Sequence, residues 1–160
     1  IFNLIGPLSS PAQVKRQVIG VFDKKWMKPF AEALKDNGVV HAFIVHSEDG
    51  MDEISPFAKT NVVELKDKTI KEFTIDPKTL GVNSSNKENL KGKNAIYNAE
   101  KIIEIFKGKK NEFSQSVALN VAAGLIVSDK ENDFKISYEK ATNHLNSGNV
   151  FQHLVKIQSN

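Results

Sequence analysis

The chain has 160 residues, of which 40% are hydrophobic and 26% charged, fractions typical of an ordinary globular domain. Its net charge is only +3 and its lysines are interspersed with acids, so we expect no nucleic-acid partner. Cysteine is absent, which excludes disulfides and thiolate metal sites and is typical of a reducing compartment. No apolar run approaches the ~20 residues of a membrane span, and we expect a cytoplasmic protein with no membrane partner.

The first residues predict a piece of a longer protein. Residue 1 is Ile rather than Met, and residues 1–8 form an apolar segment with a Gly6-Pro7 corner. Chain termini are usually polar and loosely held. We therefore expect this chain to be the C-terminal part of something longer.

The segment that follows predicts a strand–helix–strand unit. Residues 17–22 are a short apolar run typical of a buried strand. Asp23 is suited to cap a helix over residues 24–37, and Gly38 is suited to end it. An apolar strand follows at residues 39–46, and a helix between two strands predicts that they pair in parallel.

The remainder predicts a hairpin followed by helices. Residues 62–65 and 69–75 are β-rich runs on either side of a short polar turn, and residues 76–93 predict a long loop. Apolar residues at helical spacing predict four helices, at 94–106, 112–128, 133–146 and 148–158. The second of these is apolar nearly all round, so we expect it to be buried. Together these elements predict one α/β domain over residues 1–160, with a mixed, mostly parallel sheet flanked by helices.

The acidic segment 45–56 is the strongest candidate for chemistry. Its four carboxylates, Glu48, Asp49, Asp52 and Glu53, follow a predicted strand and are divided by Gly50, which supplies a turn. Ligands of open α/β sheets gather at the carboxyl ends of strands, and oxygen-only ligands suit magnesium. The alternative is a polar loop whose acids complement a helix N-terminus.

The histidines and the Gly6-Pro7 corner are weaker candidates. The positions of His41 and His46 differ by an odd offset, so a strand points them to opposite faces and they make a poor metal pair. His46 is either a donor to an anionic ligand or a satisfied strand-end residue. Gly6 and Pro7 form a rigid corner that could shape a pocket. The sequence contains no serine elbow, HExxH or Walker loop.

Several runs together resemble the anthranilate phosphoribosyltransferase family. The most specific are the Phe-Asn-x-x-Gly-Pro-Leu corner at residues 2–8 and the Asp-Gly-x-Asp-Glu segment at residues 49–53. The match continues in order through residues 17–21, 98–99, 118–123 and 147–150. The resemblance implies the C-terminal domain of the nucleoside phosphorylase/phosphoribosyltransferase-like fold, of the glycosyltransferase family 3 type.

The resemblance also implies a reaction in tryptophan biosynthesis. Such enzymes join the amino group of anthranilate to C1 of phosphoribosyl pyrophosphate and release pyrophosphate. By this resemblance Asp52 and Glu53 hold magnesium and Gly6 and Pro7 line the anthranilate channel, while no residue of this chain is assigned as catalytic. His46 is added as a candidate substrate contact. The complete enzyme is expected to be a homodimer whose contacts lie mostly outside this chain.

Departures from the family pattern limit what this chain is expected to do alone. The family corner usually has Asn where this chain has Ser10. The family's N-terminal helical domain, glycine-rich phosphate loop, Lys-His-Gly-Asn segment and anthranilate-binding arginine would all precede Ile1. We therefore expect the isolated chain to be inactive. The alternatives are a non-catalytic module with a residual magnesium–pyrophosphate site and a relative of the nucleoside phosphorylases.

Overall fold

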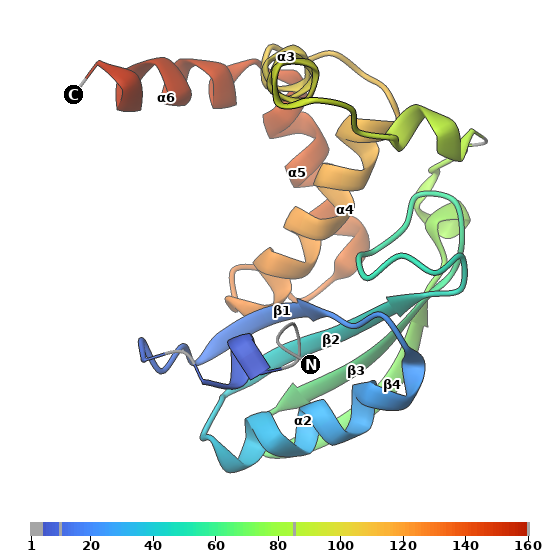
Figure 1. The fold of residues 1–160 in the computed structure, drawn as a ribbon, viewed down its shortest axis with the longest axis vertical. Helices are drawn as coiled ribbons and strands as arrows, with labels where there is room; N and C mark the ends of the chain where they lie inside the picture. Colours follow the sequence, from blue (N-terminus) through green and yellow to red (C-terminus); the bar gives the residue numbers. More distant parts are fainter. Residues whose placement is uncertain (1–4, 10, 85, 160) are drawn as a thin grey trace.

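A computed structural model describes residues 5–9, 11–84 and 86–159, so Ser10 and residues 2–4 of the predicted corner lie outside the described residues. The described chain forms a four-stranded sheet with helices on both faces (Figure 1). The strands lie in the order β1 (Arg16–Gly20), β2 (His41–Ser47), β3 (Thr60–Lys66) and β4 (Thr69–Ile75). None of the helices within the described ranges is long and apolar enough to cross a membrane.

The predicted strand–helix–strand unit is confirmed. Strands β1 and β2 pair in parallel, with Arg16 opposite His41. The Asp23 side chain accepts a hydrogen bond from the Lys25 backbone at the start of the 3₁₀ turn η2 (Lys24–Trp26), which leads directly into helix α2 (Met27–Asp36). Gly38 follows with φ of 72°, a left-handed conformation that suits glycine.

The prediction of a mostly parallel sheet is wrong for the described strands. Strand β3 runs antiparallel to β2, and β4 runs antiparallel to β3. The physical reason lies in the connections, because parallel neighbours need a long crossover that is usually helical. Helix α2 supplies one between β1 and β2, whereas residues 48–59 form a loop without a helix and Asp67-Lys68 form a tight hairpin turn.

The four predicted C-terminal helices are confirmed as α3 (Ala95–Phe106), α4 (Glu112–Val127), α5 (Phe134–Asn146) and α6 (Asn149–Gln158). The predicted long loop contains two short 3₁₀ turns, η3 (Pro77–Leu80) and η4 (Lys87–Leu90). A further 3₁₀ turn, η1 (Gly6–Leu8), precedes β1.

The sheet separates two hydrophobic cores. Residues of alternating orientation on β2 divide between them, with Phe43 and Val45 packing toward α4 and α5 while Ala42 and Ile44 pack toward α2. Strand β2 is therefore apolar on both faces, which explains its continuous hydrophobic run. This burial places β2, and with it the start of the acidic loop, between the two helical layers.

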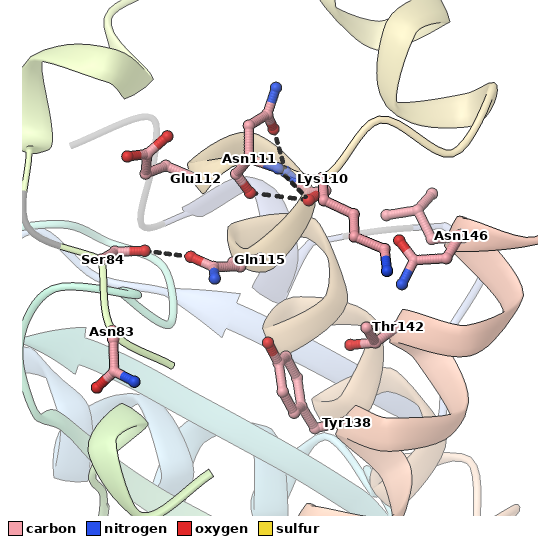
Figure 2. A pocket seen from close by; sticks show the side chains of 11 residues that line it. Asn83, Ser84, Lys110, Asn111, Glu112, Gln115, Tyr138, Thr142 and Asn146 are labelled. Carbon is pink, nitrogen blue, oxygen red and sulfur yellow. Dashed lines mark hydrogen bonds between the residues drawn. The ribbon is translucent and has the colours of Figure 1, made fainter. Parts of the chain in front are cut away.

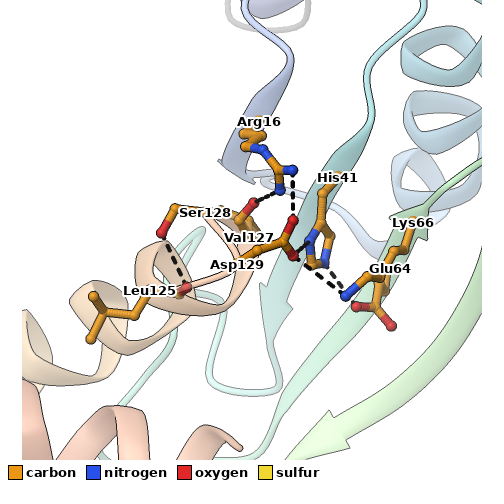
Figure 3. Close-up of polar contacts among 8 residues, drawn as sticks. All are labelled: Arg16, His41, Glu64, Lys66, Leu125, Val127, Ser128 and Asp129. Carbon is orange, nitrogen blue, oxygen red and sulfur yellow. Dashed lines mark hydrogen bonds and ion pairs between the residues drawn. The ribbon is translucent and has the colours of Figure 1, made fainter. Parts of the chain in front are cut away.

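A cluster of polar side chains around the buried His41 joins the end of α4 to three strands (Figure 3). His41 is fully buried, and its Nε2 and Nδ1 lie 2.9 Å from Glu64 Oε1 and 3.3 Å from Asp129 Oδ1. Arg16 pairs with Asp129 at 2.6 Å and donates to the Val127 carbonyl at 2.7 Å. The Arg16 guanidinium lowers the pKa of the Asp129 carboxyl. These contacts fix where α4 lies on the sheet.

The expectation that α4 is buried is confirmed for only part of its surface. Eight of its residues are buried, as the apolar sequence predicted, but Val121 is 45% exposed. The sheet covers one side of α4 and helix α5 covers one flank, while the described part of the chain leaves the face that carries Val121 partly open to solvent.

Candidate functional site

The acidic segment forms the loop between β2 and β3, above the carboxyl ends of β1 and β2. Gly50 has φ of 88° and supplies the predicted turn. The turn is closed by hydrogen bonds from the Ser47 backbone to the Met51 carbonyl at 2.9 Å and from the Gly50 backbone to the Ser47 carbonyl at 3.0 Å. No helix forms before Pro56, as expected.

Asp49 has a structural role inside this loop. It accepts hydrogen bonds from the Met51 backbone at 3.3 Å and the Ser55 hydroxyl at 2.9 Å, and Lys87 Nζ lies 3.4 Å from its carboxylate. Burial raises the pKa of Asp49, but hydrogen bonds from Ser47, Ser55 and the Met51 backbone, with the nearby Lys87 charge, hold that pKa below its ordinary value. The Asp49 carboxylate therefore braces the loop.

Asp52 and Glu53 instead border an open recess between the sheet and α4. The recess has a volume of about 560 Å³ and lies beside Gly20 and Val45, at the carboxyl ends of the two parallel strands. Its opposite wall is formed by residues of α4: Ser116, Val117, Asn120 and Val121. Both carboxylates are exposed to solvent. The structure thus places the two predicted metal ligands at the sheet edge where the sequence located them.

Gly20 lets the loop backbone approach the end of β1. A Cβ atom at this position would lie 1.5 Å from the Asp52 carbonyl oxygen and 2.6 Å from its carbonyl carbon, far inside contact distance. Any larger residue would push the loop away from the strand. A glycine here therefore determines where the backbone of the candidate ligands lies.

Asn120 fixes the same loop from the side of α4. Its Oδ1 accepts a hydrogen bond from the Ile54 backbone at 3.0 Å, while its Nδ2 donates to the Ile54 carbonyl at 3.1 Å and to the Ser116 carbonyl at 2.9 Å. Ile54 is fully buried, so its backbone has no water to bond with. The residue directly after Glu53 is thereby held at both its donor and its acceptor.

The donor set fits magnesium when the remaining ligands come from elsewhere. Within residues 5–9, 11–84 and 86–159, neither Asp52 nor Glu53 forms an ion pair, so both carboxylates face the recess uncompensated. The same ranges contain no group of three or more His, Cys, Asp or Glu residues placed to hold a metal. Magnesium is commonly bound by one or two carboxylates together with water and substrate phosphates.

His46 lies apart from the recess. It is half-buried at the end of β2, and its Nδ1 lies 2.9 Å from the Val21 carbonyl oxygen. Because a carbonyl oxygen can only accept, Nδ1 carries the proton, and Nε2 is the remaining nitrogen for a ligand. This geometry matches the interpretation of His46 as a strand-end residue, and its role as a substrate contact stays a prediction.

Gly6 and Pro7 are also separate from the carboxylates. Pro7 lines a hollow of about 320 Å³ with Val14 and Gln17, near the start of β1, and with Leu34 of α2. Asp52 and Glu53 lie at the opposite end of β1. The described residues therefore do not bring the corner and the carboxylates into one hollow, and the predicted anthranilate contacts stay a prediction.

A second polar hollow lies at the start of α4 and contains none of the predicted site residues (Figure 2). It has a volume of about 420 Å³, and Lys110, Gln115, Tyr138 and Thr142 are among its lining residues. Burial raises the pKa of the Tyr138 hydroxyl. This hollow is distinct from the recess of Asp52 and Glu53, since no residue lines both.

Sequence reasoning did not assign the three residues that shape the candidate site. Gly20 carried one usable signal, since a glycine at a strand end often marks close approach of another backbone. In the sequence, Asp49 looks like the other three acids of the segment. Its carboxylate points into the loop because it contacts Ser55 and Lys87. Asn120 lies 66 residues from its partner Ile54, so no local pattern could identify the contact.

Comparison with known proteins agrees with the family resemblance of the sequence motifs. A profile of the family described as "Glycosyl transferase family, a/b domain" matches residues 1–151. Anthranilate phosphoribosyltransferase of Pelagibacter ubique (strain HTCC1062) is 55% identical over 159 residues, which are 99% of this chain and 48% of that protein. The protein of the same name from Azospirillum brasilense is 44% identical over 160 residues, 98% of this chain and 45% of that protein. This chain therefore spans about half the length of the curated relatives it matches.

Solved structures of anthranilate phosphoribosyltransferases have the same fold over the length of this chain. The crystal structure of anthranilate phosphoribosyltransferase from Thermus thermophilus superposes with a TM-score of 0.86 at 33% identity, covering 97% of this chain and 46% of that one. The Saccharomyces cerevisiae enzyme in complex with PRPP and Mg gives a TM-score of 0.82 at 26% identity, covering 94% and 44%. These matches confirm the family resemblance that the sequence motifs predicted.

Proposed function

This chain belongs to the glycosyl transferase family that the matching profile describes, and we propose that it is the part of an anthranilate phosphoribosyltransferase that carries the magnesium carboxylates. The whole enzyme would join the amino group of anthranilate to C1 of phosphoribosyl pyrophosphate, releasing pyrophosphate, as a step of tryptophan biosynthesis. We further propose that residues 1–160 act as one α/β domain of a cytoplasmic homodimer whose subunit contacts lie mostly outside this chain.

The observation that carries this proposal is the placement of Asp52 and Glu53. Two adjacent, exposed carboxylates stand at the carboxyl ends of parallel strands, where α/β proteins bind ligands. The close contact at Gly20 and the two hydrogen bonds to Asn120 hold their backbone in place. A loop that merely complements a helix N-terminus would have no need of this bracing.

The proposed division of labour follows from this geometry. Asp52 and Glu53 would hold the metal, and Asp49, Gly20 and Asn120 position them without touching it. When bound, magnesium supplies charge neutralisation for the pyrophosphate leaving group. His46 Nε2, Gly6 and Pro7 are proposed as substrate contacts, and each would contribute to binding and orientation rather than to proton transfer.

Metal binding in the presence of pyrophosphate tests the assignment. We compare the wild-type chain, the double variant Asp52→Asn with Glu53→Gln, and a control, Asp36→Asn with Glu139→Gln, which removes the same charge from exposed helix positions. Calorimetric titration with Mn²⁺ and pyrophosphate should show at least ~10-fold weaker binding for the site variant, equivalent to a loss of about 1.4 kcal/mol. Equal affinities of the site and control variants would overturn the proposal.

A non-catalytic module is the second candidate, and the incomplete ligand set favours it for the chain on its own. The recess offers two carboxylates, and the described ranges contain no group of three or more His, Cys, Asp or Glu residues placed to hold a metal. The two candidates differ once the other half of the enzyme is supplied. Transfer of phosphoribosyl to anthranilate then supports the transferase, whereas metal–pyrophosphate binding without transfer supports the module.

A further inference from the structure

The polar hollow at the start of α4 has no part in the proposed function. Its volume of about 420 Å³ is within the range of small-molecule sites. It lies where the first turns of α4 meet the second half of α5, and Asn83 and Ser84 of the preceding loop complete its lining (Figure 2). The lining mixes polar groups with the apolar side chain of Leu145. These features make the hollow a candidate for a ligand other than the one held at the recess.

Two hydroxyl groups of α5 line this hollow without a hydrogen-bond partner. Tyr138 is only 8% exposed, and its hydroxyl points from α5 toward the first turns of α4 (Figure 2). The Thr142 hydroxyl oxygen is buried beside it. Among the described residues neither hydroxyl forms a hydrogen bond, whereas Ser84 and Gln115 of the same hollow bond to each other. A buried hydroxyl without a partner destabilises the fold, and a ligand bonded to Tyr138 would remove part of that cost.

The charge around the hollow favours an anion. Lys110 lines the hollow and belongs to none of the ion pairs among the described residues, and its side chain extends toward Asn146 of α5 (Figure 2). The 16-residue helix α4 begins beside it, and a helix N-terminus carries a partial positive charge. Glu112 is the acid among the described lining residues. It accepts a hydrogen bond from Asn89 at 3.0 Å and lies on the other side of the helix start from Lys110 (Figure 2).

We propose that this hollow binds a small carboxylic acid, with the carboxylate between Lys110 and the Tyr138 hydroxyl and the hydrocarbon part against Leu145. One lysine with neutral donors matches the single charge of a carboxylate, whereas a phosphate group carries up to two charges and three strong acceptor oxygens.

The Tyr138 hydroxyl is suited to donate to such a ligand. Burial raises the pKa of Tyr138, and the neighbouring Thr142 hydroxyl offsets this only in part, so the phenol keeps its proton at neutral pH. The hollow shares no lining residue with the recess of Asp52 and Glu53, so the proposal is independent of the metal assignment.

Backbone amide NMR shifts of the 160-residue chain test the site directly. Hexanoate is titrated as the probe, with hexanamide as its uncharged analogue and inorganic phosphate as the alternative anion. We expect hexanoate to shift the amides of residues 110–115 and 138–146, which surround the hollow. Hexanamide and phosphate should bind at least ~5-fold more weakly, because the first lacks the charge and the second does not match the donors.

The chain offers a matched control for each proposed contact. Lys110→Gln should weaken hexanoate binding at least ~5-fold and Tyr138→Phe at least ~3-fold, since a charge-assisted hydrogen bond is stronger than a neutral one. Lys130→Gln, beyond the other end of α4, and Tyr97→Phe of α3 should bind like the wild type, because neither residue lines the hollow. Without ligand, Tyr138→Phe should keep or raise the melting temperature, because it removes a buried hydroxyl that lacks a partner.

Four results would overturn the carboxylate site. They are the absence of shifts with hexanoate, shifts confined to residues 117–125 of α4, equal hexanoate affinities of the Lys110 and Lys130 variants, and tighter binding of phosphate than of hexanoate. A lower melting temperature of Tyr138→Phe together with unchanged hexanoate affinity would likewise assign the hydroxyl a structural role and overturn the proposal. None of these results bears on Asp52 and Glu53, which lie outside the hollow.

Discussion

Gly20 lies where the loop backbone at Asp52 approaches the end of β1, with no room for a side chain. Because a Cβ atom there would overlap the Asp52 carbonyl at 1.5 Å, we expect Gly20→Ala to destabilise the fold by about 1–3 kcal/mol and to displace the loop that carries Asp52. Urea unfolding measures the first effect, and backbone NMR shifts of the loop measure the second.

Gly124 of α4 is the control for this change. It has no heavy atom within 4 Å of an added Cβ, so Gly124→Ala should stabilise the helix by up to about 1 kcal/mol. If Gly20→Ala behaves like Gly124→Ala, the close contact at the end of β1 does not restrain the loop.

The Asp49 carboxylate makes the stability of the fold depend on pH. Its folded-state pKa is held below the ordinary value, so its ionised form stabilises the fold above about pH 3.9. That contribution is lost as the pH falls through the lower folded-state pKa. We therefore expect Asp49→Asn to lose stability at neutral pH and to show a smaller decline toward about pH 3 than the wild type.

The measurement is the free energy of unfolding in urea at several pH values. Asp36→Asn, at the exposed end of α2, should keep the wild-type pH dependence. A parallel decline of wild type and Asp49→Asn would mean that the Ser55 and Lys87 contacts do not stabilise the ionised carboxylate.

Helix boundaries were predicted well because their signals are local. Asp23, Asn94 and Asp133 each accept a backbone hydrogen bond at the start of a helix or turn, as short polar residues do at N-caps. The antiparallel direction of β3 relative to β2 has no such local signal. Strand pairing depends on how a connection returns to the sheet, and residues 48–59 contain no periodic pattern that predicts a crossover helix.

Helix α6 should be the least protected helix of the isolated chain. It contacts α3 and α5 but has no buried described residue, whereas α4 has eight. Opening free energies range from near zero in loosely packed segments to the global value in the core. We expect amide hydrogen exchange of α6 to be at least ~100-fold faster than that of the buried face of α4.

The same exchange experiment distinguishes two explanations of α6. Comparable protection of α6 and α4 would mean that α6 packs against the body more tightly than its exposure indicates. Fast exchange in the isolated chain would instead mean that α6 is held only by its few contacts with α3 and α5.

For the molecule as a whole, the sequence identifies the candidate carboxylates but not the contacts that hold their loop. Asp52 and Glu53 stand out because carboxylates after an apolar run are visible in a short window. Their support comes from residues far along the chain, as in the hydrogen bonds of Asn120 to Ile54 across 66 positions. Such contacts exist only after the helices have packed on the sheet, so they carry no local signal.

The isolated chain is expected to show no turnover. With phosphoribosyl pyrophosphate, Mg²⁺ and anthranilate present, the loss of anthranilate fluorescence should proceed no faster than without protein. The physical reason is that the two carboxylates of the recess are exposed to solvent, and electrostatic stabilisation of a leaving group is strong only where water is excluded. The full-length Pelagibacter enzyme serves as the positive control. Turnover by the 160-residue chain would mean that the described recess is already a complete site, and that the metal assignment needs no further ligands from outside this chain.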